Sequence, residues 1–202
     1  MRITVFGATG RMGQLLVRRA LDEGHEIVAY ARHPDKLQID DSRLSVFPGE
    51  LDDHEGIIQA VMGADAVIEG VGSQSDGTRR IITAMETVKV RRFVVVSTCS
   101  VTDPADRPDL KRAALVRLVK TAAPGPYKQV RAAADAVRAS NLDWTLVRVA
   151  RLTDDPPTGN IKVGYYGDGK VGISITRADM AAFLLGQTID DHYLRQAPAI
   201  ST

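Results

Sequence analysis

A glycine turn that directly follows an apolar stretch at the start of the chain is the feature that most restricts its fold. The stretch Ile3–Phe6 precedes residues 7–13, whose sequence GATGRMG spaces its glycines as G-x-x-G-x-x-G. The residues that follow repeat apolar side chains at helical intervals, with Leu16, Ala20 and Leu21 on one face. A strand, a glycine turn and an amphipathic helix in this order predict the first unit of a dinucleotide-binding fold.

Short β-branched runs alternate with helical patterns along most of the chain. The expected strands are Ile3–Phe6, Glu26–Ala31, Leu44–Phe47, Ala66–Ile68, Phe93–Ser97 and Thr145–Val149. Strict alternation of strand and helix predicts right-handed βαβ units and a parallel sheet, and 202 residues suit one domain. We therefore expect an α/β fold of the Rossmann type, a doubly wound parallel sheet flanked by helices. It would be a single domain over residues 1–202, with a small C-terminal elaboration on the substrate side.

The second half of the chain is predicted to supply further helices, loops and one strand. The expected elements are helices at Leu110–Lys120 and about Lys128–Ser140, and a strand at Asn160–Tyr166. The stretches richest in Pro and Gly, Thr121–Pro126 and Asp154–Gly159, are predicted to be loops. Thr176 is the expected N-cap of the last helix, with Asp179 in its first turn.

The glycine turn has the features of a phosphate-binding site. Gly7 permits a tight turn, Gly10 lets the backbone approach a pyrophosphate, and Gly13 allows the helix to pack closely on the strand. The free amides from about Thr9 to Met12 would then face the phosphates at the positive end of the helix. A tight turn that binds no ligand is the alternative interpretation.

The end of the second expected strand, residues 29–34 with the sequence AYARHP, indicates which dinucleotide binds. No acidic residue stands in this segment, where NAD-preferring sites carry an Asp or Glu for the ribose 2′-hydroxyl. Arg32 is predicted to hold a 2′-phosphate, with Arg11 and His33 as helpers. A solvated surface side chain is the alternative for Arg32. We therefore expect NADP(H) as the cofactor, with NAD(H) as the second choice.

Composition narrows the classes of partner. A net charge of +1 gives no general attraction to nucleic acid or anionic membranes, and no apolar run approaches the roughly 18 residues of a membrane span. Because no signal-peptide pattern follows Met1, we expect a cytoplasmic protein. Its expected partner is a small-molecule substrate, and its oligomeric state is left open. Cys99, the single cysteine, is expected to be a buried neutral thiol, and the scattered histidines predict no metal site.

Motifs spread over nearly the whole chain resemble those of one family. They are GATG at residues 7–10, GEL at 49–51, ADAV at 64–67, VVVST at 94–98, RASNLDWT at 138–145 and ITRADMA at 175–181. This set resembles the atypical short-chain dehydrogenase/reductase family with NAD(P)H-binding domains, which includes flavin reductases similar to biliverdin reductase B. The last motif is the most telling outside the glycine turn, because the family carries a similar stretch before its last helix.

The resemblance implies further contacts with the cofactor. The implied residues are Glu50 and Leu51 beside the adenine, and Gly70, Val71 and Gly72 over the dinucleotide. Glu50 departs from the family, which more often has Asp-Val after the glycine. Ser97 and Thr98 would reach the nicotinamide end, where a hydroxyl can bond the carboxamide or the substrate. Ser and Thr also end strands without any functional role.

The proton-transfer residues of ketone-reducing relatives are not clearly present. Those enzymes use a Tyr and a Lys four residues later, whereas Tyr127 is followed at that distance by Arg131. An Arg can lower the pKa of a neighbouring phenol but lacks the compact ammonium group of Lys. Another register of the helix would put Val130 at the lysine position. We therefore expect a site without a working Tyr-Lys pair.

Basic residues are predicted on the substrate side. Arg148 and Arg151 end the sixth expected strand, where the resemblance places the substrate. Arg151 could hold a phosphate or carboxylate, and its alternative is a surface pair with Asp154 or Asp155. The basic run of the helix at 110–120 is expected to be a solvated face or a lid over the substrate; it contains Lys111, Arg112, Arg117 and Lys120.

The lack of a proton donor disfavours ketone substrates more than it disfavours conjugated rings. A conjugated ring delocalises the charge that arrives with the hydride, and solvent can supply the proton. We therefore expect an NADPH-dependent reductase of a planar conjugated acceptor, a flavin, a quinone or a tetrapyrrole-like molecule. Its candidate catalytic residues are Ser97, Thr98, Tyr127 and Arg151. The first alternative is a non-catalytic NADP(H)-binding redox sensor similar to NmrA-type regulators. The second, an epimerase-like or ketone-reducing enzyme, requires Tyr127 beside the nicotinamide.

Overall fold

The strand β1 (Arg2–Phe6), the helix α1 (Arg11–Asp22) and the strand β2 (Glu26–Ala31) form the first βαβ unit, as predicted. The structure is a computed structural model that describes residues 1–72 and 74–202. β1 and β2 are parallel, with Ile3 opposite Ile27. The residues of β1 after Arg2 are all buried, because helices cover both faces of the sheet.

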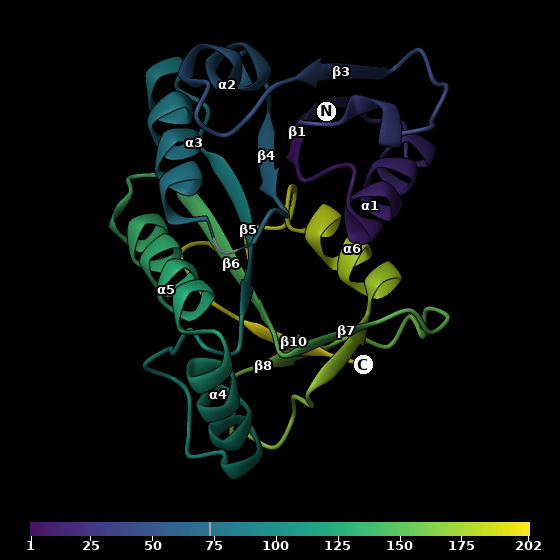
Figure 1. The fold of residues 1–202 in the computed structure, drawn as a ribbon. Helices are drawn as coiled ribbons and strands as arrows, with labels where there is room; N and C mark the ends of the chain where they lie inside the picture. The colour runs from purple at the N-terminus through teal and green to yellow at the C-terminus, as the bar shows by residue number, and fades with distance from the viewer. Residues whose placement is uncertain (73) are drawn as a thin grey trace.

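The main sheet of the described residues has eight strands in the order β3-β2-β1-β4-β5-β6-β10-β8 (Figure 1). Its other strands are β3 (Leu44–Pro48), β4 (Ala66–Glu69), β5 (Arg92–Thr98), β6 (Asp143–Val149), β8 (Lys162–Gly164) and β10 (Ala199–Ser201). The order 3-2-1-4-5-6 is that of a Rossmann fold, and only the β10–β8 pair is antiparallel among these strands. The predicted fold class is therefore confirmed. A small parallel sheet of β7 (Arg151–Thr153) and β9 (Ser174–Thr176) was not predicted.

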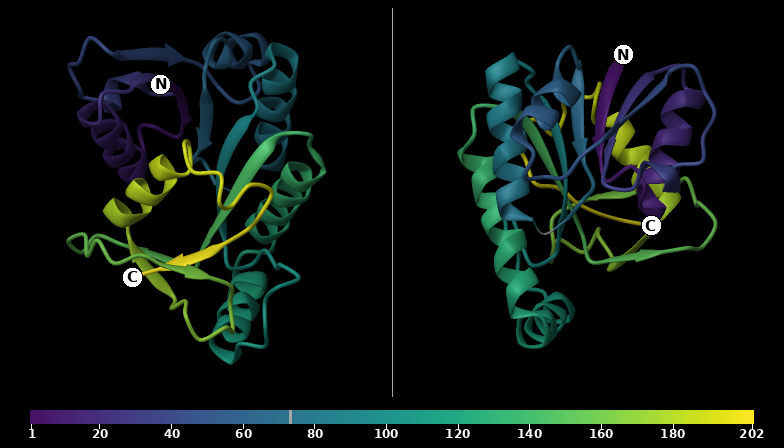
Figure 2. Two further views of the ribbon diagram at one scale, coloured as in Figure 1. Left: turned by 180° about the vertical axis from the view of Figure 1, so that it is seen from behind. Right: turned by 45° about the horizontal axis from the view of Figure 1, so that its top comes forward.

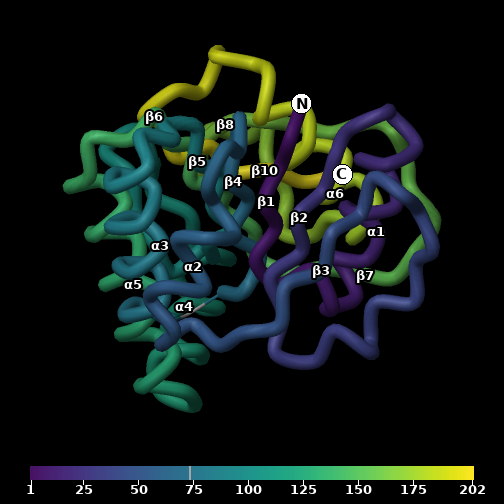
Figure 3. Tube along the Cα trace, turned by 90° about the horizontal axis from the view of Figure 1, so that it is seen from above, coloured from purple at the N-terminus to yellow at the C-terminus, as the bar shows by residue number. Residues whose placement is uncertain are grey.

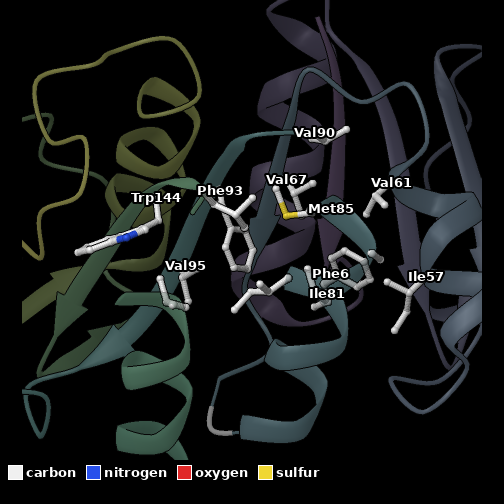
Figure 4. Packing of buried hydrophobic residues seen from close by; sticks show 14 of the residues in the cluster. Phe6, Ile57, Val61, Val67, Ile81, Met85, Val90, Phe93, Val95 and Trp144 are labelled. Carbon is white, nitrogen blue, oxygen red and sulfur yellow. The ribbon is translucent and has the colours of Figure 1, made fainter. Parts of the chain in front are cut away.

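Helices lie on both faces of the main sheet (Figure 3). One face carries α1 and α6 (Arg177–Gly186), and the other carries α2 (His54–Val61), α3 (Ser75–Val88) and α5 (Pro124–Ala139). On the α1 face, apolar helix residues pack against Ile3 and Val147. On the α3 face they pack around Phe6, Val67 and Phe93 (Figure 4). The sheet is therefore buried between two apolar layers, which leaves the ends of its strands for ligands.

The helix α4 (Leu110–Ala122) is separated from α5 only by Ala123. The predicted loop at Thr121–Pro126 was therefore wrong. Pro124 stands at the first position of α5, where a helix tolerates proline because the amide there has no partner within the helix. In both views of Figure 2, α4 lies beyond the end of α5 at one extremity of the molecule.

The C-terminal third agrees with the predictions in part. The strand expected at Asn160–Tyr166 is limited to β8, whereas Asp154–Gly159 has neither helix nor strand, as predicted. Thr176 is the N-cap of α6, and its hydroxyl oxygen accepts a hydrogen bond from the Asp179 amide at 3.0 Å, as predicted. Among the helices of the described chain, none combines the length and apolar character that a bilayer crossing requires.

Candidate cofactor and substrate site

Gly7 and Gly13 shape the turn between β1 and α1. Gly7 has a φ of +88°, which side chains rarely adopt, and a Cβ at this position would lie 3.0 Å from the carbonyl carbon of Gly70. A Cβ at Gly13 would overlap the Gly7 carbonyl oxygen and would lie 2.9 Å from the Cα of Ala8. The predicted tight turn and the predicted close packing of helix on strand are therefore both present.

The N-terminus of α1 can receive an anion. Gly10 is the N-cap without a side-chain hydrogen bond, and the first turn contains no acidic residue. The amides of Arg11, Met12 and Gly13 have no acceptor within the helix, and their partial positive charge suits a phosphate. The amide of Gly10 instead donates to the Gly7 carbonyl at 3.1 Å, so the prediction that this amide is free was wrong.

A cleft of about 720 Å³ opens beside the glycine turn, a size typical of cofactor sites. The predicted cofactor residues that line it are Gly7, Thr9, Gly10, Arg32, His33, Glu50, Leu51 and Val71. The lining does not include Arg11, Met12, Gly13, Gly70 or Gly72. Of these, Met12 is buried, and Gly70 packs against Gly7. The fold thus brings most of the predicted cofactor residues from separate segments to one cleft.

Cationic side chains gather where β2 ends. Arg32, His33 and Lys36 line this part of the cleft, and all are exposed. The side-chain amide of Gln14 donates to the carbonyl oxygens of Thr9 at 3.0 Å and Lys36 at 3.4 Å, which ties this segment to the glycine turn. Lys36 was not predicted; its place four residues after Arg32 was the signal that could have found it.

Tyr30 at the end of β2 holds the loop that follows β3. Its hydroxyl donates to the Glu50 carbonyl at 3.0 Å, and burial raises the pKa of Tyr30 to about 12, so it stays a donor. From the other side, Arg80 of α3 donates to the carbonyl of Leu51 at 3.1 Å. The cleft wall formed by Glu50 and Leu51 is therefore held in place by two different elements. Sequence reasoning did not identify this role of Tyr30 or Arg80.

Tyr127 and Arg131 meet on α5, as their spacing of four residues allows. Arg131 Nη1 donates to the Tyr127 hydroxyl at 3.4 Å and to the Ser100 carbonyl at 3.4 Å. The guanidinium carbon lies 5.7 Å from the centre of the Tyr127 ring. Val130 is buried in the core. The structure therefore places an arginine, and not a lysine, beside the candidate tyrosine.

Ser97 and Thr98 end β5 on opposite faces of the sheet. Thr98 is half-buried, and its hydroxyl oxygen accepts a hydrogen bond from the Ser100 amide at 3.2 Å. Ser97 is only 3% exposed, and its hydroxyl has no hydrogen-bond partner in the described part of the chain. Thr98 is the more accessible of the two. Cys99, the next residue, is buried, and burial raises the pKa of its thiol, as expected for a neutral cysteine.

Arg148 does not lie at a substrate surface, contrary to the prediction. Its wholly buried side chain donates to both carboxylate oxygens of Asp106, at 2.7 and 2.9 Å, and to the Ala197 carbonyl at 2.7 Å. Arg112 of α4 approaches the same carboxylate at 3.5 Å and is 13% exposed, so the predicted solvated face was wrong for this residue. A buried guanidinium needs such acceptors, and the cluster fastens the loop after β5 to β6 and α4.

Arg11 and Arg151 lie near the loop that starts at Asp154. The Asp154 carboxylate accepts hydrogen bonds from Arg11 at 2.7 Å and from Arg177 at 2.5 Å. Arg151 is exposed on β7 and forms no ion pair within residues 1–72 and 74–202. The alternative predicted for Arg151, a pair with Asp154 or Asp155, was therefore wrong.

A family model described as NAD(P)H-binding matches residues 7–191. The chain belongs to the NAD(P)H-binding family. The matched segment begins at the glycine turn and extends past α6, so it contains both motifs on which the predicted resemblance chiefly depended. The resemblance is therefore confirmed, and the cleft beside the glycine turn is where a member of this family would hold its dinucleotide.

A curated relative resembles this chain in sequence, and two solved structures resemble it in fold. A probable pinoresinol-lariciresinol reductase of Arabidopsis thaliana is 26% identical over 203 residues, covering 94% of this chain but only 63% of the plant protein. A short-chain dehydrogenase/reductase of Veillonella parvula in complex with NADP has a TM-score of 0.85 and 23% identity, covering 100% and 94% of the two chains. ChuY, an anaerobilin reductase of Escherichia coli O157:H7, has a TM-score of 0.83 and 20% identity, covering 100% and 97%. Both structures share the fold of this chain.

The described residues fit the cofactor class of the NAD(P)H-binding family. The turn has no room for a side chain at Gly7 or Gly13, which lets the α1 amides face a diphosphate at close range. Leu51 and Val71 contribute apolar surface to the lining of the cleft, and Arg32 and Lys36 contribute positive charge. The cleft therefore suits an anionic dinucleotide.

Proposed function

We propose that this chain is an NADPH-dependent reductase that transfers hydride to a planar conjugated small molecule, such as a flavin, a quinone or an open-chain tetrapyrrole. One observation carries the proposal: the dinucleotide cleft has cationic side chains at one end, while Tyr127 stands beside Arg131 in place of a Tyr-Lys pair. The plant relative and ChuY are named as reductases, and the Veillonella protein was solved with NADP. These similarities support the same class of reaction.

In this proposal the chain orients two reactants and leaves most proton transfer to solvent. Bound NADPH supplies the hydride. The α1 amides hold the diphosphate, Arg32 and Lys36 bind the 2′-phosphate, and Thr98 bonds the carboxamide or the acceptor. Arg151 holds an anionic group of the acceptor, for which a flavin phosphate or a tetrapyrrole carboxylate is suitable. Correct placement of the acceptor ring is then the main source of rate acceleration.

Arg32→Asp is expected to weaken NADPH binding by roughly 10- to 100-fold, the loss of one or more hydrogen bonds to a charged group. NADH binding should change by less than about threefold, because NADH lacks the 2′-phosphate. Fluorescence titration of both cofactors measures the ratio. Arg117→Asp makes the same charge change on the exposed surface of α4 and should leave both affinities unaltered. An unchanged preference in Arg32→Asp would remove this residue from the site.

Turnover is tested by mixing the purified protein with NADPH and FMN, a quinone or biliverdin, and following the loss of NADPH absorbance. Tyr127→Phe should retain activity within about threefold, because no phenol proton is needed. Thr98→Val and Arg151→Ala should each lower kcat/KM by about tenfold or more, in line with lost positioning contacts. A large loss in Tyr127→Phe, with activity on ketones, would instead favour the ketone-reducing alternative.

The redox-sensor alternative uses the same cleft. An arginine in place of a lysine beside Tyr127 suits a binding protein as well as a flavin-type reductase. Tight NADPH binding without turnover on any acceptor would therefore overturn the reductase proposal and favour the sensor.

A further inference from the structure

Glu69 is a buried carboxylic acid directly behind the cofactor cleft. It is the last residue of β4 and is 2% exposed. Strand alternation puts its side chain on the same face as Val67, between Phe6 of β1 and Val95 of β5, whose side chains appear in Figure 4. That face is covered by α3 and α5. The carboxyl group is therefore enclosed by apolar side chains and the first turn of α3.

Burial favours the neutral form of Glu69, and its hydrogen bonds can accommodate the proton. The Thr78 hydroxyl lies 2.7 Å from Glu69 Oε1 and 3.1 Å from the Gln74 carbonyl oxygen, but it has only one proton to donate. The second carboxyl oxygen of Glu69 is buried and has no partner within the described residues. A protonated Glu69 can donate to Thr78, which then donates to Gln74, so both hydroxyl protons have acceptors and the oxygen without a partner carries no charge. Burial raises the pKa of Glu69 to about 7, and the hydrogen bond with Thr78 acts in the opposite direction.

This hydrogen-bonded chain leads to the wall of the cleft. Gln74 is the N-cap of α3 and lines the cleft together with Ser75. The amide and hydroxyl of Ser75 both donate to the side-chain oxygen of Gln129 on α5. On the other side, Gly70 follows Glu69 directly and packs against Gly7 of the phosphate-binding turn. A change at Glu69 is therefore adjacent to two walls of the site.

The charged side chains on the elements packed against Glu69 contact other groups or lie at the surface. On α3, Asp76 pairs with Arg79 at the surface, and Arg80 donates to the Leu51 carbonyl. On α5, Arg131 contacts Tyr127 and Ser100, and Lys128 and Asp135 are exposed. β1 and β5 contribute apolar side chains at this level of the sheet. Burial and Thr78 are thus the influences that set the charge of Glu69.

We propose that Glu69 is a positioning residue that links cofactor affinity to pH: neutral Glu69 supports the binding-competent cleft, and ionised Glu69 weakens binding. The inference rests on the proposed binding of NADPH. Ionisation takes the Thr78 hydroxyl proton away from the Gln74 carbonyl, which then keeps only its hydrogen bond from the Thr78 amide at 3.0 Å, so the N-cap of α3 is held by one bond in place of two. It also places a buried negative charge behind a cleft that receives phosphates, and repulsion in this low-dielectric region is not screened as it would be in water.

The test compares the NADPH dissociation constants of the wild type and Glu69→Gln from about pH 6 to about pH 8.5. Glutamine keeps the shape and the neutral charge, so the ratio of wild-type to variant dissociation constants should rise roughly fivefold over this range, as expected for one nearby charge. Titration of the NADPH phosphate cancels in this ratio. Glu86→Gln, an exposed change on α3, should give a ratio that does not depend on pH.

Infrared spectroscopy of the wild type measures the protonation of buried carboxyl groups directly, without a binding measurement on a variant. The C=O stretch of a protonated carboxylic acid should be present at about pH 6 and disappear by about pH 8.5, and Glu69→Gln should lack it. A pH-independent ratio, or no such band, would overturn the inference while leaving the reductase proposal intact. Failure to bind NADPH at any pH would overturn both. Tight binding without turnover would overturn only the reductase.

Discussion

Asp106→Asn is expected to lower the free energy of unfolding by about 3–5 kcal/mol, the usual cost of removing one member of a buried ion pair. The change leaves the guanidinium of Arg148 wholly buried without the negative charge that it now contacts at 2.7 and 2.9 Å. It also weakens the acceptor for the backbone amides of Asp103 and Tyr166, at 2.9 and 3.1 Å. Urea denaturation followed by the fluorescence of Trp144, the single tryptophan, measures the loss.

Asp41→Asn is the matched control for this prediction. Asp41 holds Arg43 through both carboxylate oxygens, at 3.1 and 2.7 Å, but at the surface, so the expected cost is much smaller than for Asp106→Asn. Replacing both charges, with Asp106→Leu and Arg148→Met, should cost less than Asp106→Asn because the wholly buried guanidinium of Arg148 is removed together with its partner. Equal losses in Asp106→Asn and Asp41→Asn would show that the buried pair contributes no more than a surface pair.

The pH at which the stability loss of Asp106→Asn should be measured depends on the ionisation of Asp106. Burial is the largest single influence and opposes its charge, but the hydrogen bonds from Arg148 and the Asp103 amide, together with the charges of Arg148 and Arg112, hold the pKa of Asp106 below its usual value. A carboxyl whose folded pKa is lowered stabilises the fold fully above the unfolded value of about 3.9. This stabilisation is lost as the pH falls through the folded pKa. The predicted difference between wild type and Asp106→Asn is therefore complete near pH 7 and shrinks in acid.

Gly13→Ala is expected to weaken NADPH binding by at least about tenfold and to lower the free energy of unfolding by about 1–3 kcal/mol, as overpacking does. The added Cβ would overlap the Gly7 carbonyl oxygen and would lie 2.9 Å from the Cα of Ala8. Both neighbours are backbone atoms, so relief requires α1 to move away from the turn. That movement would carry the helix amides away from the phosphates. Fluorescence titration and thermal denaturation measure the two effects.

Gly186→Ala is the matched control, because it also adds a methyl group to a helical glycine. A Cβ at Gly186 would meet nothing within 4 Å. We expect unchanged NADPH affinity and a gain in stability of up to about 1 kcal/mol. If Gly13→Ala bound NADPH as well as Gly186→Ala did, the close packing of α1 on the turn would not be what positions the amides.

The strand order and the glycine turn could be predicted because their signals are local and periodic. Apolar β-branched runs such as Phe93–Ser97 indicate strands whatever their tertiary contacts. Helical repeats between these runs indicate βαβ units, and βαβ units form a parallel sheet. The sheet of β7 and β9 was missed because three-residue strands are too short to show alternation. The break predicted at Pro124 failed because proline is tolerated in the first turn of a helix.

The cofactor end of the site was more predictable than the substrate end. Arg32 could be named from its place after β2, since the first βαβ unit of this fold puts that position beside the phosphate turn. Lys36 could have been named from its spacing of four residues from Arg32, but no comparable rule covers the support that Tyr30 gives to Glu50. At the other end, Arg131 could be located four residues after Tyr127, but its further contact with the Ser100 carbonyl depends on how α5 lies against β5.

By itself the sequence determined the Rossmann-type class, the glycine turn and the family, because each depends on residues close together in the chain or on a repeated pattern. Only the tertiary structure decided which charged groups are buried. Arg148 was predicted at the substrate end of its strand, but Asp106, 42 residues away, neutralises it in the interior. Glu69 carries no sequence signal of its burial, which depends on how α3 encloses it. Burial and pairing depend on side chains contributed by distant segments, and sequence spacing carries no record of those contacts.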